Sequence, residues 1–232
     1  MSKMKRVFPI LGILTAILLS YALYLALVWA PTEQTMGNVQ RIFYYHVPSA
    51  WTAFLLFFTN FAASVFYLLR RKTTADIVAL VCAEVGLVFL TVNLVTGPIW
   101  ARPVWGIWWT WDWRLTSTLV VWLIYVSYLM LRRFASGETP VMAAALGIFG
   151  ALCVPFVYFS IWFFRTQHPQ PVVGGGGSLD PRMAHALLIN WLAFLGFAFL
   201  VCWSRYRLER VKREVEEAQA LESLMDSPRS AR

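Results

Sequence analysis

The chain has 232 residues, of which 59% are hydrophobic and only 14% are charged. A soluble domain carries about 25% charged residues, so this composition excludes an ordinary soluble domain and indicates a membrane protein. The net charge of +8 comes mostly from short basic segments between apolar stretches. Such segments are typical of loops at an anionic membrane leaflet and not of a nucleic-acid interface, so we expect lipid and no nucleic acid as a partner.

Six apolar stretches are each close to the length of about 20 residues that a helix needs to cross the hydrocarbon core. Five of them contain no charged residue, and the third is interrupted only by Glu84. We therefore expect an all-α polytopic membrane protein, with a six-helix transmembrane domain over residues 1–204 and a charged tail over residues 205–232. The expected helices span residues 7–30, 47–69, 77–101, 115–131, 141–164 and 183–204.

Lys and Arg residues predict the orientation of these helices. Basic residues precede the first expected helix and follow the second, the fourth and the sixth, whereas the other connections hold few of them. Because basic loops stay in the cytoplasm, both termini are expected there, and the connections after the first, third and fifth helices are expected on the outer face. The basic residues concerned are Lys3, Lys5, Arg6, Arg70, Arg71, Lys72, Arg132, Arg133 and those of the tail from Arg205.

The second and third expected helices each contain one residue of interest. His46 lies at the outer mouth of the second helix, where Pro48 fits the first turn because its missing N–H wastes no hydrogen bond there. Glu84 lies inside the third helix, and ionisable residues within the membrane are functional candidates because burying their charge is costly. It is either a carrier site or a carboxyl group that fixes helix packing. The carrier interpretation supports an alternative function, an ion- or proton-coupled transporter.

The connection between the third and fourth expected helices is rich in tryptophan. An aromatic belt is one interpretation, because indole rings favour the membrane interface. A belt places about one or two aromatic residues at each helix end, however, and this cluster is denser. It indicates a platform for a large flat apolar ligand, since indole faces stack on a conjugated ring and indole N–H groups donate hydrogen bonds at its edge. The platform residues are Trp100, Trp105, Trp108, Trp109, Trp111 and Trp113.

Two further histidines follow on the expected outer side. His168 lies beyond the fifth expected helix, and His185 lies in the first turns of the sixth. His185 is expected to be a structural residue whose ring is hydrogen-bonded locally. His46 and His168 flank the tryptophan cluster, and we expect them to bind a metal from opposite sides, since haem iron accepts axial histidine. The cysteines show no C-x-x-C spacing, which excludes covalent haem attachment; they are Cys82, Cys153 and Cys202.

Two motifs resemble a known family. The pattern W-G-x-W-W-x-W-D-x-R-L-T occupies residues 105–116, and an H-V-P-S-A-W element spans His46–Trp51. Both resemble the tryptophan-rich (WWD) haem-handling membrane proteins of cytochrome c maturation, and six helices in a chain of this size are similar to the cytochrome c maturation protein C family. The resemblance covers nearly the whole chain. It implies non-covalent haem b, with His46 and His168 as the axial ligands, although the family usually reads T-L-H-Q-P where this chain reads T-Q-H-P-Q.

The resemblance also implies a role in haem delivery. Haem bound at the periplasmic face of a bacterial inner membrane would pass to a membrane-anchored haem chaperone. The implied partners are this chaperone, a small single-helix subunit, and an ABC-type ATPase with its membrane subunit. The chain itself is expected to be neither an enzyme nor an ATPase, because GGGGS at residues 174–178 lacks the Lys-Ser/Thr ending of a phosphate loop and is typical of a flexible linker.

The polar residues of the tryptophan cluster suggest how haem would be oriented. A guanidinium group binds a carboxylate bidentately, so Arg102 or Arg114 is expected to hold the haem propionates, and Arg114 has the better position in the motif. Asp112 either accepts a hydrogen bond from an imidazole N–H or pairs with Arg114. Two axial imidazoles would saturate the iron and suppress oxygen chemistry, which indicates delivery rather than catalysis.

The tail begins as a charged helix. Leu208, Val211 and Val215 recur among charged residues, which predicts a solvated amphipathic helix leaving the membrane. Residues 227–232 are expected to be disordered.

Overall fold

The computed structural model describes residues 2–135, 139–164, 166–168 and 179–226. The expected linker at residues 174–178 and the expected disordered end at residues 227–232 lie outside these ranges. Six helices are long and apolar enough to cross a membrane, which confirms the predicted all-α polytopic fold. They are α1 (Ser2–Tyr24, continued by the π-helical turn Leu25–Trp29), α2 (Phe43–Arg70, preceded by the 3-10 helix Asn38–Ile42), α3 (Thr73–Trp105), α4 (Trp113–Phe134), α5 (Thr139–Phe163) and α6 (Pro181–Asp226).

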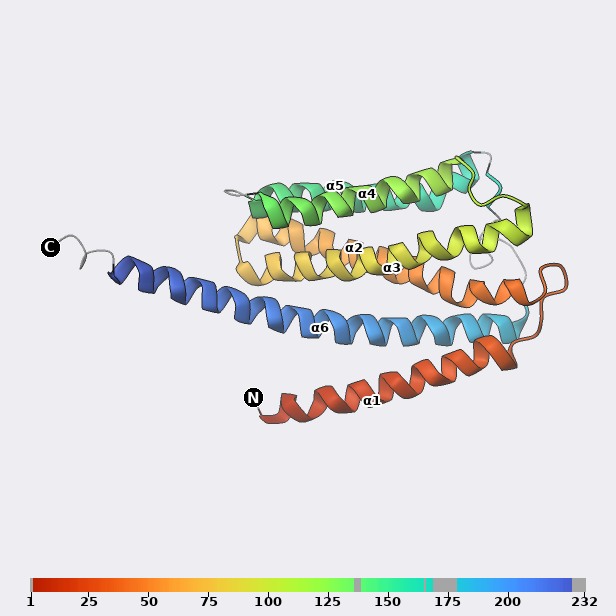
Figure 1. The fold of residues 1–232 in the computed structure, drawn as a ribbon, viewed down its shortest axis with the longest axis horizontal. Helices are drawn as coiled ribbons and strands as arrows, with labels where there is room; N and C mark the ends of the chain where they lie inside the picture. Colours follow the sequence, from red (N-terminus) through yellow and green to blue (C-terminus); the bar gives the residue numbers. More distant parts are fainter. Residues whose placement is uncertain (1, 136–138, 165, 169–178, 227–232) are drawn as a thin grey trace.

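The six helices lie side by side and alternate in direction (Figure 1). α2 packs against α3, α5 and α6, α4 packs against α5 and α3, and α1 contacts the bundle through α6. One end of the bundle, which we call the tryptophan end, holds the connection from α3 to α4. The opposite end, the termini end, holds both chain ends, and α6 projects beyond the other helices there (Figure 1).

The centre of the bundle combines an aromatic stack with satisfied polar groups. The rings of Phe57 on α2 and Tyr125 on α4 are stacked 3.7 Å apart, and both side chains are fully buried. The Tyr125 hydroxyl lies 3.3 Å from the Gly147 carbonyl oxygen, and the Asn60 amide donates to the Ala79 carbonyl oxygen at 2.7 Å. Polar groups in a membrane interior need such partners because no water is available to them. The hydrogen bonds therefore join α2 to α3 and α4 to α5.

The connection at the tryptophan end is shorter than the sequence suggested. α3 continues past residue 101 to Trp105 and ends at Gly106, whose φ of 77° is the left-handed conformation that glycine adopts without steric cost. α4 begins directly after Asp112, whose side chain accepts a hydrogen bond from the Leu115 N–H at 2.9 Å and so caps the helix. Trp105 consequently lies on helix α3 and not in a loop, which corrects its expected placement, and Trp100 lies on α3 within the expected helix of residues 77–101.

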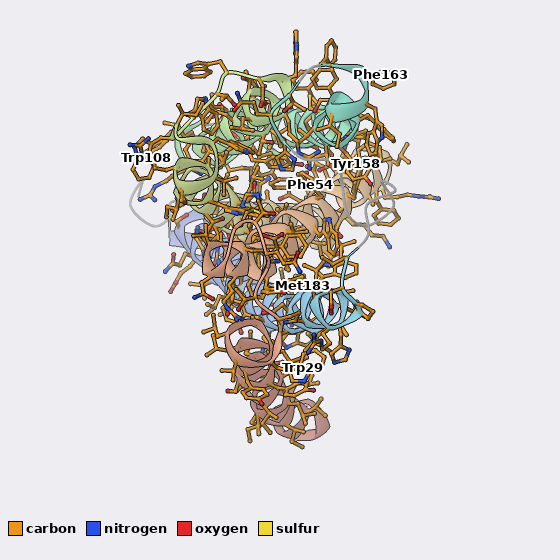
Figure 2. All side chains as sticks on the ribbon, turned by 90° about the vertical axis from the view of Figure 1, so that its right-hand side faces the viewer. Trp29, Phe54, Trp108, Tyr158, Phe163 and Met183 are labelled. Carbon is orange, nitrogen blue, oxygen red and sulfur yellow. The ribbon has the colours of Figure 1, made fainter. Side chains whose placement is uncertain are left out.

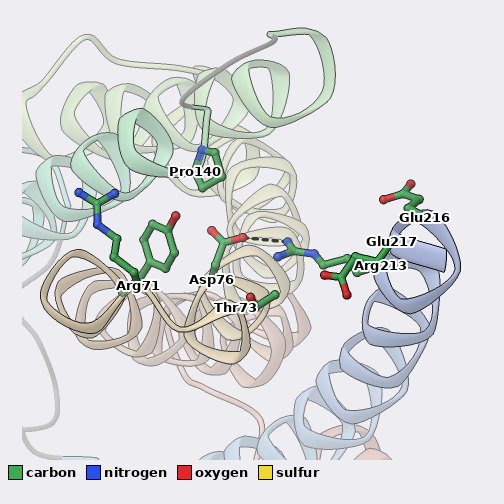
Figure 3. A pocket seen from close by; sticks show the side chains of 8 residues that line it. Arg71, Thr73, Asp76, Pro140, Arg213, Glu216 and Glu217 are labelled. Carbon is green, nitrogen blue, oxygen red and sulfur yellow. Dashed lines mark ion pairs between the residues drawn. The ribbon is translucent and has the colours of Figure 1, made fainter. Parts of the chain in front are cut away.

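The termini end is held together by arginine–carboxylate pairs. Arg132 on α4 contacts both oxygens of the buried Asp76 on α3, at 2.5 and 2.9 Å, and Arg213 on α6 contacts Asp76 at 2.8 Å. Figure 3 shows the Asp76–Arg213 pair at the side of a pocket of about 300 Å³. Arg205 binds Glu84 with two hydrogen bonds of 2.9 Å. These pairs fix the first turns of the tail against α3 and α4, and α6 is one unbroken helix from Pro181 to Asp226.

Candidate functional site

His46 lies in the first turns of α2 and faces α3. α2 begins at Phe43, earlier than expected, so His46 and Pro48 are both inside the helix. The His46 Nδ1 atom lies 2.9 Å from the Thr96 hydroxyl oxygen, and the Asn93 amide nitrogen lies 3.1 Å from Nε2. The ring also contacts the Trp100 indole edge-on, with the ring centres 5.7 Å apart. Three side chains of α3 therefore set the position of this imidazole.

Of these three side chains, Trp100 was expected at the site as part of the tryptophan platform, whereas Asn93 and Thr96 were not. Asn93, Thr96 and Trp100 are spaced by three and four residues, which places them on one face of α3. This spacing is the signal in the sequence that could have identified them as partners of the neighbouring helix.

His168 is tied to the tryptophan cluster through Asp112. The His168 backbone N–H donates to the Thr166 hydroxyl oxygen at 3.0 Å, and this hydroxyl donates to the Asp112 carboxylate at 2.8 Å. The Thr110 hydroxyl donates to the same carboxylate oxygen at 3.0 Å. Asp112 thus joins the segment that follows α5 to the connection before α4. Its carboxylate accepts hydrogen bonds from two threonine hydroxyls and from the Leu115 N–H, whereas an imidazole N–H or Arg114 was expected as its partner.

The two histidines and Arg114 converge at the tryptophan end. His168 and Arg114 both lie close enough to His46 to act electrostatically on its charge. Among the described residues, the Arg114 guanidinium donates only from its Nη1 atom. The acceptors are the Val157 and Tyr158 carbonyl oxygens of α5, each at a distance of 3.4 Å. These long bonds leave other N–H groups of Arg114 available for a carboxylate. Residues from α2, α4 and the segment after α5 therefore lie near one another at this end of the bundle.

Arg102 is less suited to the same task. It is exposed near the end of α3, and its Nη1 donates to the carbonyl oxygen of Gly106. This bond closes the C-terminus of α3, where helix carbonyl groups lack partners. Arg102 therefore has a local structural role.

The tryptophans fall into two groups. Trp100 faces His46, while Trp109 and Trp111 line an open hollow of about 510 Å³ together with Leu94, Pro98 and Leu119. Leu94 and Pro98 lie on a different face of α3 from the residues that contact His46, because their spacing from them is not that of one helix face. The hollow therefore lies on a different face of α3 from His46.

The other tryptophans of the platform, and Trp111 as well, lie mostly at the surface. Trp105 is half-buried at the last position of α3, and Trp113 stacks on Phe164 with ring centres 4.4 Å apart. Trp108 and Trp111 are 59% and 77% exposed. Figure 2, which views the molecule from the tryptophan end, shows Trp108 at the edge of the bundle. Rings this exposed at a membrane surface are available to a flat ligand or to lipid.

His185 lies apart from this group. It is an exposed residue of α6, and its ring contacts Trp29 edge-on with the ring centres 5.6 Å apart. Figure 2 shows Trp29 and Met183 on the α1–α6 side, away from Trp108 and Phe163. The contact of His185 is thus with an aromatic ring, and the structural, hydrogen-bonded role expected for it stays a prediction.

Comparison with known proteins identifies the family. The model of the family described as heme exporter protein C matches residues 1–221. The chain is 34% identical to the heme exporter protein C of Bradyrhizobium diazoefficiens, over 94% of this chain and 84% of that protein. It is 32% identical to the proteins of the same name from Haemophilus influenzae, over 90% of this chain and 86% of that protein, and from Escherichia coli, over 83% and 78%. A match over nearly the whole length shows that this chain belongs to the heme exporter protein C family.

Proposed function

We propose that this protein binds haem b non-covalently through His46 and His168 and delivers it to a haem chaperone of cytochrome c maturation. The observation that carries the proposal is that these two histidines, from segments far apart in the chain, lie within electrostatic range of each other at the tryptophan end, with Arg114 also near His46. The family name, heme exporter protein C, supports haem as the molecule that is handled. Haem here is cargo, because a delivery protein has to release what it binds.

The chemistry of the surrounding groups fits haem. Imidazole nitrogens are good axial ligands for haem iron. The indole N–H groups of Trp100 and Trp109 are buried and have no hydrogen-bond partner among the described residues. An unpaired buried donor is unfavourable, so these two N–H groups favour a ligand with acceptors at its edge. Arg114 would hold a propionate, and the hollow beside Trp109 and Trp111 would take an apolar ring edge.

The two expected ligands are held differently, which suits delivery. His46 belongs to a long helix and contacts three side chains of α3. His168 lies outside the helices, in a segment anchored through Thr166 and Asp112. Release of haem requires at least one axial bond to break. We infer that the bond to His168 breaks first, because moving a short segment disturbs less packing than moving a helix.

The proposal includes a location and partners. The tryptophan end would face the periplasm and both termini the cytoplasm of a bacterial inner membrane, as the basic residues predict. The partners would be the haem chaperone, a small single-helix subunit, and an ABC-type ATPase with its membrane subunit. ATP hydrolysis would then be supplied by another subunit, and this chain would contribute the haem site.

The contacts of Glu84 bear on the choice between this proposal and an ion-coupled transporter. Its carboxylate is bound by both Nε and Nη2 of Arg205, so it is already occupied by a fixed cation. A carrier site has to exchange its cation during each cycle, whereas this pair joins α3 to α6. The contact favours the packing interpretation of Glu84.

Purified protein is therefore expected to show a Soret band that shifts on reduction. Glu84→Gln is expected to leave this spectrum and the haem affinity unchanged, because Glu84 lies near the termini end. Absorption spectra of both proteins, prepared with added haem, check this prediction. Colourless wild-type protein that conducts ions in vesicles, with flux lost in Glu84→Gln, would overturn the proposed function.

A further inference from the structure

Two polar side chains of α3 contact both ring nitrogens of His46. The Thr96 hydroxyl oxygen lies 2.9 Å from Nδ1, and the Asn93 amide nitrogen lies 3.1 Å from Nε2 and 3.3 Å from Nδ1. Asn93 is only 8% exposed, so these hydrogen bonds are shielded from water. A neutral imidazole has one donor and one acceptor nitrogen, and its surroundings decide which is which.

The hydroxyl of Thr96 can only accept a hydrogen bond from His46. Its oxygen lies 2.7 Å from the Val92 carbonyl oxygen and 3.2 Å from that of Asn93. A carbonyl oxygen cannot donate, so the single hydroxyl proton is used toward Val92, within helix α3. The short contact between Thr96 and Nδ1 therefore requires the proton to be on Nδ1. The Nε2 atom is then left with a free lone pair.

The amide of Asn93 is oriented by the His46 backbone. The Asn93 amide nitrogen lies 3.1 Å from the His46 carbonyl oxygen, which only accepts, so the NH₂ group and not the amide oxygen faces His46. One of its two N–H groups is used there. The nitrogen lies at nearly equal distances from Nε2 and Nδ1, 3.1 and 3.3 Å, which places it over the ring and not along the lone pair of either ring nitrogen.

We propose that Thr96 is a positioning residue that prepares His46 for iron. Thr96 fixes the tautomer in which Nε2 is unprotonated, and Asn93 joins α3 to the His46 backbone without using the Nε2 lone pair. This inference rests on the proposed role of His46 as a haem ligand. Thr96 then favours iron binding because it fixes the ligating nitrogen.

The tautomer is tested in haem-free protein. Nitrogen NMR of protein labelled with ¹⁵N-histidine distinguishes protonated from unprotonated ring nitrogens, and the His46 signals are assigned by their loss in His46→Ala. Wild-type protein and Thr96→Ser, which retains the hydroxyl, are expected to show Nδ1 protonated and Nε2 unprotonated. Thr96→Val, which has the same shape without the hydroxyl, is expected to populate the other tautomer. Wild-type protein with the proton on Nε2 would contradict the proposal without any reference to haem.

The effect on iron binding is tested with ferric haem. Thr96→Val is expected to weaken haem affinity about tenfold or more, the usual effect of losing a group that orients a metal ligand, and Thr96→Ser is expected to restore it. Titration of the haem-free proteins with haem, followed by Soret absorption, measures the affinities.

The outcomes separate this inference from the proposed function. Equal haem affinity of Thr96→Val and Thr96→Ser would reduce Thr96 to a packing group and overturn the inference. A haem spectrum that is unchanged in His46→Ala would overturn the proposed ligand, whatever the NMR result. A wild-type NMR spectrum as expected, together with weaker haem binding in Thr96→Val and not in Thr96→Ser, would support both.

Discussion

His46→Ala and His168→Ala are each expected to convert a six-coordinate haem spectrum to a five-coordinate one. The reason is that each imidazole would supply one of the two axial bonds, and the small alanine side chain supplies none. Loss of a residue that only orients a metal ligand lowers metal affinity about 10- to 100-fold. Loss of a ligand itself should therefore weaken haem binding by about 100-fold or more. The double variant is expected to lose axial ligation entirely. Absorption and resonance Raman spectra of the purified variants measure the coordination state.

The matched control is the third histidine. His185→Ala is expected to leave the spectrum unchanged, because His185 lies against Trp29 on the α1–α6 side of the bundle. Added imidazole should restore the six-coordinate spectrum in either single variant, since it can enter the vacated axial position while the rest of the site still holds the ring. Lost ligation in His185→Ala with a normal spectrum in His168→Ala would mean that α6, and not the segment after α5, provides the second ligand.

The number and type of helices could be predicted from the sequence because membranes impose a length. An apolar run of about 20 residues without charge has few alternatives to a spanning helix. The helix ends were less predictable, since hydropathy marks where an apolar run stops and not where the backbone leaves the helix. α3 continues to Trp105 because Gly106 is the first residue that ends it, and α6 continues through its charged tail because Arg205 and Arg213 find carboxylate partners on α3.

The two histidines of the candidate site could be selected from the sequence, but the residues that contact them could not. His46 and His168 stood out because histidine is rare in this chain and both were expected on one membrane face. The hydrogen bonds that hold them depend on which helix faces pack together. Thr166 and Asp112 are 54 positions apart, and Asn93 and His46 are 47 apart, so no local pattern relates them. Pairings of this kind follow from tertiary packing, which a single sequence does not determine.

The ion-pair cluster at the termini end could not be predicted from the sequence either. Its disruption is expected to have the largest effect on stability. Asp76 is buried, with its side chain 4% exposed, and it binds Arg132 and Arg213 from two other helices. It also lies in the first turn of α3, where a negative charge interacts favourably with the helix dipole. Arg213 also pairs with Glu209 at 3.1 Å, so Asp76 matters most for Arg132, whose side chain is only 9% exposed.

Asp76→Asn is expected to lower the free energy of unfolding by about 3–5 kcal/mol, the cost of leaving a buried charge without its partner. Asparagine keeps the size of the side chain, so the loss reports charge and not a cavity. The matched control is the exposed pair of Arg210 and Glu214, 2.8 Å apart on the projecting part of α6. Arg210→Ala should cost only about 0.3–0.5 kcal/mol, because water and salt screen an exposed pair within one helix. Unfolding of the purified protein in detergent, followed by circular dichroism, measures both changes. Equal stability of Asp76→Asn and Arg210→Ala would show that the cluster holds α6 in place no more firmly than a surface contact does.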